Sequence, residues 1–208
     1  KSSAAYNSAH RYLRTGLDLL TETCWNDQYD LALALHTEAA EAAYLVTEFD
    51  EMERLAGLVR ENARSDLDQV RPAEIRIAGF IAQARKVEAV NTAIEVLRLL
   101  KVSVPSEPKT LDVLLQLVRT KIALIGKPTE QLVERPLSED PRILAAMRII
   151  ASIGSTAYVT YPNLFPVLIC KGVELSVRNG HTPHSPFLYS LYGTVLCGAL
   201  GDLDGGYR

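Results

Sequence analysis

Two histidines within one short segment are the side chains whose spacing comes closest to a metal site. They stand in His181-Thr182-Pro183-His184, where two imidazoles could bind one metal ion together. A zinc site needs three or four protein ligands, and no third ligand lies nearby in the sequence. We therefore expect a solvated loop between helices here, and no metal site.

Two other segments resemble ligand-binding loops but are incomplete. Asp202-Leu203-Asp204-Gly205 begins like a calcium loop, yet it lacks the later ligands and the closing glutamate. Gly126-Lys127 does not complete a phosphate-binding loop, because Lys121 stands where GxxxxGK needs its first glycine. Pro128 also stands where Ser or Thr is needed. We interpret the first segment as a turn between repeats and the second as a helix end.

Nucleophilic side chains have no partner base that the sequence reveals. Ser185 precedes Pro186 and has the pattern of a helix cap, and Cys24 lies beside Trp25 at a helix end. The cysteines are odd in number, far apart and set among apolar neighbours: Cys24, Cys170 and Cys197. This pattern favours reduced thiols in a cytoplasmic protein over a disulfide framework. We expect no catalytic residue and no cofactor.

Composition excludes two classes of partner. Hydrophobic residues make up 48% and charged residues 23% of the chain, which is typical of a folded domain, and the net charge is -3. Without a basic excess, we expect neither nucleic acid nor a membrane as a partner. No charge occurs between Arg148 and Lys171, a stretch of roughly transmembrane length. Pro162 and Pro166 interrupt it, so we predict two buried helices joined at 161–163.

Acidic residues gather in one part of the chain, around a predicted helical hairpin. They are Glu38, Glu41, Glu48, Asp50, Glu51 and Glu53. A group of this kind is typical of a solvated face, and a docking surface for a basic partner is the alternative.

Apolar spacing predicts helices nearly throughout the chain. One run recurs every three or four residues, as on one face of an α-helix: Leu111, Leu114, Leu115, Val118, Ile122 and Ile125. Asp140-Pro141 and Ser185-Pro186 place a capping side chain before a proline at the first helical position, and Asn179-Gly180 is a helix stop. We predict helices near 4–23, 28–47, 50–64, 73–85, 87–101, 110–125, 129–134, 141–160, 163–178 and 186–200.

The prolines of 104–109 predict a linker between two groups of helices. We therefore expect N-terminal helical hairpins over 1–103 and C-terminal helices over 110–208. The last predicted helix, near 186–200, is apolar on more than one side, and the chain stops before a further helix. We expect the second group to be truncated in the middle of a repeat.

Two segments share one layout, in which small residues lie within a helix and an apolar residue flanked by acids follows in the turn. The residues are Ala39, Ala40, Ala43 and Phe49 in the first segment, and Gly193, Cys197 and Leu203 in the second. Small residues let the helices of a hairpin approach closely, and the apolar turn residue fills the space between hairpins. The layout resembles the tetratricopeptide repeat. It predicts an all-α fold of antiparallel hairpins stacked as a right-handed superhelix, an α-α solenoid.

A longer resemblance covers most of the chain from Tyr6 to Arg208. It is carried by Tyr29 to Leu58, Ala93 to Val102, Asp140-Pro141 with Ala145-Ala146-Met147, and Tyr192 to Arg208. These runs resemble the helical-repeat region of large hybrid signalling kinases. In that family a Ser/Thr kinase-like domain and an AAA-like signal-transduction ATPase precede the helical arm. A GAF sensor and a histidine kinase follow it.

The resemblance implies a non-catalytic scaffold or regulatory arm that mediates protein–protein or interdomain contacts in the cytoplasm. Its partners would be other proteins or neighbouring domains of the same chain, and we also consider a homodimer through the terminal helix near 186–200. A stand-alone repeat module that binds peptides or assembles complexes is the alternative. A helical enzyme with a scattered site is a third hypothesis, which a deep pocket with convergent polar groups would support.

Overall fold

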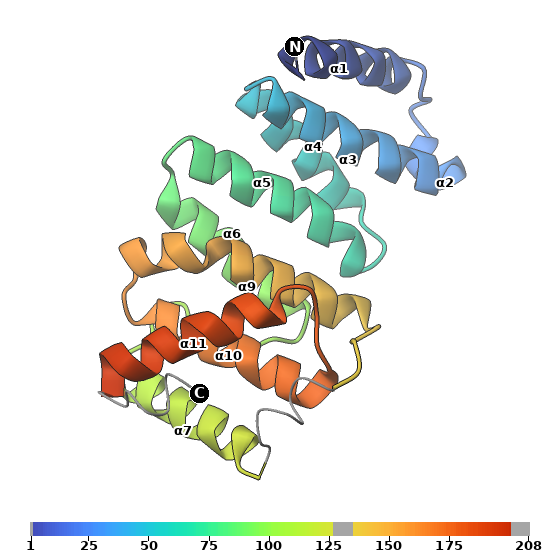
Figure 1. The fold of residues 1–208 in the computed structure, drawn as a ribbon. Coiled ribbons are helices and arrows are strands. Elements are labelled where there is room, and N and C mark those ends of the chain that lie inside the picture. Colours follow the sequence, from blue (N-terminus) through green and yellow to red (C-terminus); the bar gives the residue numbers. More distant parts are fainter. Residues whose placement is uncertain (1, 127–134, 201–208) are drawn as a thin grey trace. The chain divides into compact units, whose positions relative to one another are not determined.

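Helices make up the regular secondary structure of residues 2–126 and 135–200, the residues that the computed structural model describes (Figure 1). Within these residues a single isolated bridge joins Leu137 to His181. The prediction of an all-α chain is therefore confirmed. Residue contacts divide the chain into two compact units, 1–92 and 93–208, and helix α6 (Lys86–Leu99) runs through the division. A boundary at the linker 104–109 stays a prediction.

The first unit consists of short helices that pack around α3. Its elements are α1 (Ser2–Asp18), α2 (Cys24–Asp27), α3 (Tyr29–Leu45), α4 (Phe49–Asn62), the 3₁₀-helix η1 (Leu67–Gln69) and α5 (Val70–Ala82). Helix α3 contacts α1, α4 and α5. Their apolar faces meet in one buried cluster: Ala39, Ala40 and Ala43 from α3, Met52, Leu55 and Ala56 from α4, and Ile75 from α5. Burial of this apolar surface stabilises the unit.

The first predicted helix, 4–23, extends too far. Helix α1 ends at Asp18, and α2 is a separate helix that the sequence did not predict. The N–H groups of Leu19 and Leu20 donate to carbonyls three residues earlier, at 3.3 and 3.1 Å. Bonds of this span tighten the last turn and commonly end an α-helix.

The turn from α3 to α4 is a tight helix-terminating motif without glycine. Thr47 adopts φ of 65°, in the left-handed region. Its N–H donates to the Tyr44 carbonyl at 3.0 Å, and the Glu48 N–H donates to the Ala43 carbonyl at 2.8 Å. These two bonds define the Schellman motif, in which glycine normally takes the left-handed position. A β-branched residue there is strained, so the packing on both sides must hold the turn in place.

The same motif recurs at two further helix ends. Ala84 (φ 59°) follows α5, and Lys101 (φ 66°) follows α6. In each case the N–H of this residue donates to the carbonyl three residues earlier at 3.0 Å. The N–H of the next residue donates to the carbonyl five residues earlier at 2.8 Å, as in the first turn. Only three residues separate α3 from α4, and also α5 from α6. The α3–α4 and α5–α6 hairpins are therefore closed by backbone hydrogen bonds of one kind.

The second unit is arranged around α10 (Leu164–Asn179). This helix packs against α7 (Thr110–Leu124), α9 (Pro141–Thr160) and α11 (Ser185–Leu200). A Cβ atom on Gly172 would lie 2.6 Å from Cδ1 of Leu188, so glycine at this position allows α11 to approach α10 closely. The helix expected near 129–134 lies outside the described residues.

The uncharged stretch of transmembrane length folds as parts of two helices, α9 and α10. Helix α9 begins at Pro141, where the Asp140 carboxylate accepts a hydrogen bond from the Arg142 N–H at 2.8 Å. It ends at Thr160 and α10 begins at Leu164, which confirms two helices joined around 161–163. Within the described residues, α9 is long and apolar enough to cross a membrane, with a mean hydropathy of 1.4, but 50% of that window is buried in the fold. A core helix of a soluble protein has the same properties.

Candidate functional site

Helix α7 is unusual because its leucine-rich stripe faces away from the interior of the second unit, while two polar side chains, Gln116 and Thr120, are buried there beside Leu117. The residues of α7 that are buried are Gln116, Leu117 and Thr120. The apolar stripe recognised in the sequence lies on the other side, and each member is about half to three quarters exposed: Leu111, Leu114, Leu115, Val118, Ile122 and Ile125. An amphipathic helix of a globular protein normally turns its apolar stripe toward the core. The orientation of α7 therefore needs a specific cause.

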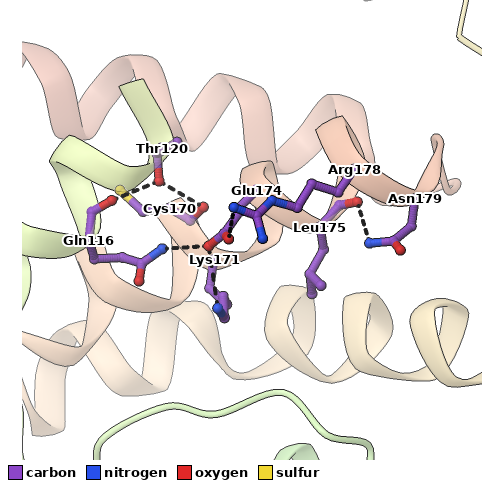
Figure 2. Close-up of polar contacts among 8 residues, drawn as sticks. All are labelled: Gln116, Thr120, Cys170, Lys171, Glu174, Leu175, Arg178 and Asn179. Atoms are coloured by element: carbon purple, nitrogen blue, oxygen red, sulfur yellow. Dashed lines mark hydrogen bonds and ion pairs between the residues drawn. The ribbon is translucent and has the colours of Figure 1, made fainter. Parts of the chain in front are cut away.

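The buried face of α7 meets a buried carboxylate on α10. The Glu174 side chain is 7% exposed, and its Oε2 accepts a hydrogen bond from Nε2 of Gln116 on α7 at 3.0 Å (Figure 2). Lys171 Nζ lies 3.3 Å from the same oxygen, and Arg178 Nη2 lies 3.0 Å from Oε1. Both carboxylate oxygens thus have donors, as burial of a charge requires.

A second polar link lies one turn further along α7. Thr120 Oγ1 is within hydrogen-bond distance of the Cys170 carbonyl on α10, at 3.2 Å, and of the Gln116 carbonyl, at 2.9 Å (Figure 2). The Cys170 carbonyl thereby accepts a hydrogen bond from α7. Gln116 and Thr120 are four residues apart and so lie on one face of α7, which fixes the rotation of this helix on α10.

The electrostatics of the cluster favour a structural role over an acid–base role. Burial acts most strongly on the pKa of Glu174 and would raise it. The hydrogen bond from Gln116 and the charges of Lys171 and Arg178 together outweigh burial, so the pKa lies below its ordinary value. The carboxylate is therefore ionised at neutral pH, and its oxygens are already occupied by donors.

Cys170 is buried beside this cluster, and its thiol is not reactive. Burial raises the pKa of its thiol to about 12, against the opposing hydrogen bond with Thr120. The nucleophile of cysteine chemistry is the thiolate, which is scarcely populated at neutral pH with such a pKa. This agrees with the reading of the cysteines as part of the core, as does the burial of Cys24.

The small residues expected to pack the first hairpin lie together. Ala39, Ala40 and Ala43 are fully buried, and Phe49 packs against their cluster. The corresponding residues of the second segment are less enclosed, since Gly193 and Cys197 on α11 are only half-buried. Leu203 and its turn lie outside the described residues.

The acidic group of the first unit is partly neutralised within the fold. Three of its members pair with arginines: Glu41 with Arg71, Glu51 with Arg54, and Glu53 with Arg85. Glu48 and Asp50 help to line an open groove of about 540 Å³ beside the α3–α4 turn, together with Thr47, Phe49, Glu51, Arg54 and Gln83. A docking surface for a basic partner stays a prediction.

The segment with the two histidines is less solvated than expected. Thr182 is 2% exposed and Ser185 is fully buried. The His181 backbone exchanges hydrogen bonds with Pro136 and Ser138, and the Ser185 hydroxyl accepts the Thr182 N–H at 2.9 Å and contacts the Ser176 hydroxyl at 2.8 Å. Ser185 is thus the first residue of α11 and its side chain is tied to α10. Within residues 2–126 and 135–200, no three histidines, cysteines or carboxylates are placed to hold a metal ion.

Among the side chains of α11 that the structure describes, up to Gly198, most of the large apolar ones are buried. Its large side chains Leu188, Tyr192, Val195 and Leu196 are buried, whereas Phe187 is 51% exposed. A homodimer through this helix stays a prediction.

Sequence reasoning missed the buried polar residues of α7, although Gln116 and Thr120 interrupt its leucines with the spacing of one helical turn. The partner of Gln116, Glu174, lies 58 residues away, so no local pattern could pair them.

These features define an all-helical protein whose buried polar contacts fasten helices to one another. No protein-family model matches the chain, and no solved structure matches it. The chain is similar to hybrid signal transduction histidine kinase G of Dictyostelium discoideum, with 20% identity over 238 aligned residues. The alignment covers 100% of this chain but 7% of that protein. The similarity supports a region of a signalling kinase, and it is too low to assign the chain to a family.

Proposed function

We propose that this chain is a non-catalytic helical arm of a multidomain signal-transduction protein, where it scaffolds or regulates neighbouring domains in the cytoplasm. The observation that carries the proposal is the similarity to the Dictyostelium histidine kinase. The whole chain aligns with a small part of a much longer protein. The partners would be a separate protein or other domains of the same chain, including an ATPase and a histidine kinase.

The arm would be a tetratricopeptide-like solenoid with a right-handed superhelical path. Within the first unit, α3 contacts both α1 and α5, so alternate helices stack on one another. Within the second unit, α9 and α11 also make contact. Stacking of alternate helices is typical of consecutive hairpins, and Schellman turns close two of them, α3–α4 and α5–α6. In such a stack each repeat contacts only its neighbours, so small shifts between repeats accumulate along the array.

The open reading frame around residues 1–208 provides the first test. We expect an ATPase domain before this segment, and a GAF sensor and a histidine kinase after it. A short reading frame without these domains would overturn the regulatory arm and favour a stand-alone module that binds peptides or assembles complexes.

A functional test uses the full-length protein with substitutions in α3. Ala40→Leu should change the level of histidine autophosphorylation, because it overpacks the cluster that joins α3 to α4 and α5. Ala34→Leu lies on the exposed side of the same helix and serves as the matched control. Equal kinase activity in both variants would mean that the arm does not regulate the kinase.

A further inference from the structure

We propose that the exposed apolar face of α7 is a docking surface for a second copy of this chain, on which two α7 helices pack antiparallel. This inference does not rest on the proposed function. Contiguous exposed apolar side chains mark interaction sites, and six such residues on one helix are far more than scattered exposure produces. The surface is defined by the α7 stripe already described, from Leu111 to Ile125.

The spacing of the stripe identifies a helix as its occupant. Five of its residues follow the heptad positions d, a, d, a and d: Leu111, Leu115, Val118, Ile122 and Ile125. Apolar residues at a and d form the seam of a coiled coil, in which side chains of one helix insert between those of another. A stripe of this kind fits a second amphipathic helix better than an extended peptide or a small ligand.

Charge complementarity supports α7 itself as the partner. In an antiparallel pair, Leu115 of one copy faces Val118 of the other. The same register places Asp112 opposite Arg119 of the second copy, and the two-fold axis repeats this pair. A parallel pair would instead place Arg119 beside Leu114 of the second copy. Opposite charges beside the seam therefore favour self-association in the antiparallel direction.

The contacts with α10 prepare α7 for this role. A helix of two heptads is only marginally stable alone in water, because nucleation is unfavourable. Here the Gln116–Glu174 and Thr120–Cys170 links hold the helix in place and set its rotation. Docking then requires little ordering of the backbone, which favours association. The stripe spans only two heptads of one helix, and a standard interface buries roughly 800 Å² per partner, so we expect a reversible dimer with a dissociation constant in the micromolar range.

Sedimentation velocity of the 208-residue chain from about 1 to about 200 μM tests the proposal. We expect the 22.9 kDa monomer to convert to a dimer as concentration rises. The double substitution Leu115→Lys with Ile122→Lys should weaken the dimer about 100-fold or more, because each change occurs twice across the two-fold axis. Val159→Lys is the control, since Val159 is exposed on α9 to the same degree, 62%, as Ile122 on α7. Unchanged circular dichroism and thermal midpoints would show that all variants remain folded.

Orientation is tested by Arg119→Glu, which should weaken the dimer about tenfold and reverse the effect of salt. An unchanged dissociation constant would overturn the antiparallel arrangement. A chain that remains monomeric at the highest concentration would overturn self-association and leave the stripe to a helix of another protein. A dimer that the α7 variants do not weaken, or that Val159→Lys weakens equally, would place the interface elsewhere and overturn the proposal.

Discussion

Replacement of Ala40 by leucine is the most direct probe of how closely the helices of the first unit approach one another. Ala40 is fully buried and belongs to the cluster in which α3 meets Met52 and Leu55 of α4 and Ile75 of α5. These three neighbours are themselves almost completely buried, so the additional carbon atoms of leucine have no solvent-facing direction to occupy. The helices must therefore separate, or the neighbours must leave their preferred rotamers.

The expected loss follows from the overpacking of well-packed cores. Extra methylene groups commonly cost about 1–3 kcal/mol, because strain outweighs the gain in buried apolar area. In a domain of this size each kcal/mol corresponds to roughly 2–4 °C, so we expect the melting temperature to fall by about 2–12 °C. Leucine and alanine are both strong helix formers, so helix propensity contributes only a few tenths of a kcal/mol.

Urea denaturation followed by circular dichroism measures the change in the free energy of unfolding. Ala34→Leu is the matched control, because Ala34 lies on the exposed side of the same helix and should tolerate leucine within about 0.5 kcal/mol. Equal unfolding midpoints for the two variants would refute the close packing of α3 against α4 and α5.

Three further outcomes are expected. Thr47→Gly should stabilise the first unit by about 0.5–1 kcal/mol, since glycine relieves the left-handed strain at the α3–α4 turn. A loss of stability in urea melts would show that the threonine side chain is needed there. Glu174→Gln should destabilise the second unit by about 1–3 kcal/mol at pH 7, because Lys171 and Arg178 lose their anionic partner. The pKa of Glu174 is lowered in the fold, so its contribution is present above the unfolded pKa and is lost as pH falls through the folded pKa. The difference between variant and unmodified protein should therefore shrink below about pH 4–5, and a constant difference in melts from pH 7 to pH 3 would contradict this assignment. Finally, isothermal calorimetry with Mg-ATP should detect no saturable binding, because the chain lacks a GxxxxGK loop followed by Ser or Thr. Micromolar affinity for Mg-ATP would overturn the proposal that this segment is a non-catalytic arm.

Local patterns were sufficient to predict most of the helices. Prolines and caps located α9 and α10 almost to the residue, because Asp140-Pro141 and the 161–163 junction act through local sterics and hydrogen bonds. The first helix was predicted too long, since bonds to carbonyls three residues back end α1 before the apolar pattern does. The turns at Thr47, Ala84 and Lys101 gave no signal, because sequence patterns associate the left-handed position with glycine or asparagine.

The sequence by itself determined that the chain is helical and which residues of each helix are apolar, because both depend on spacing along a single segment. Only the tertiary structure decided which face of α7 is buried. The buried face of α7 meets Glu174, which is far away in the sequence and whose buried charge has donors in Gln116, Lys171 and Arg178. The result is a helix that is held by Gln116, Thr120 and Leu117 and presents its leucine-rich stripe to solvent.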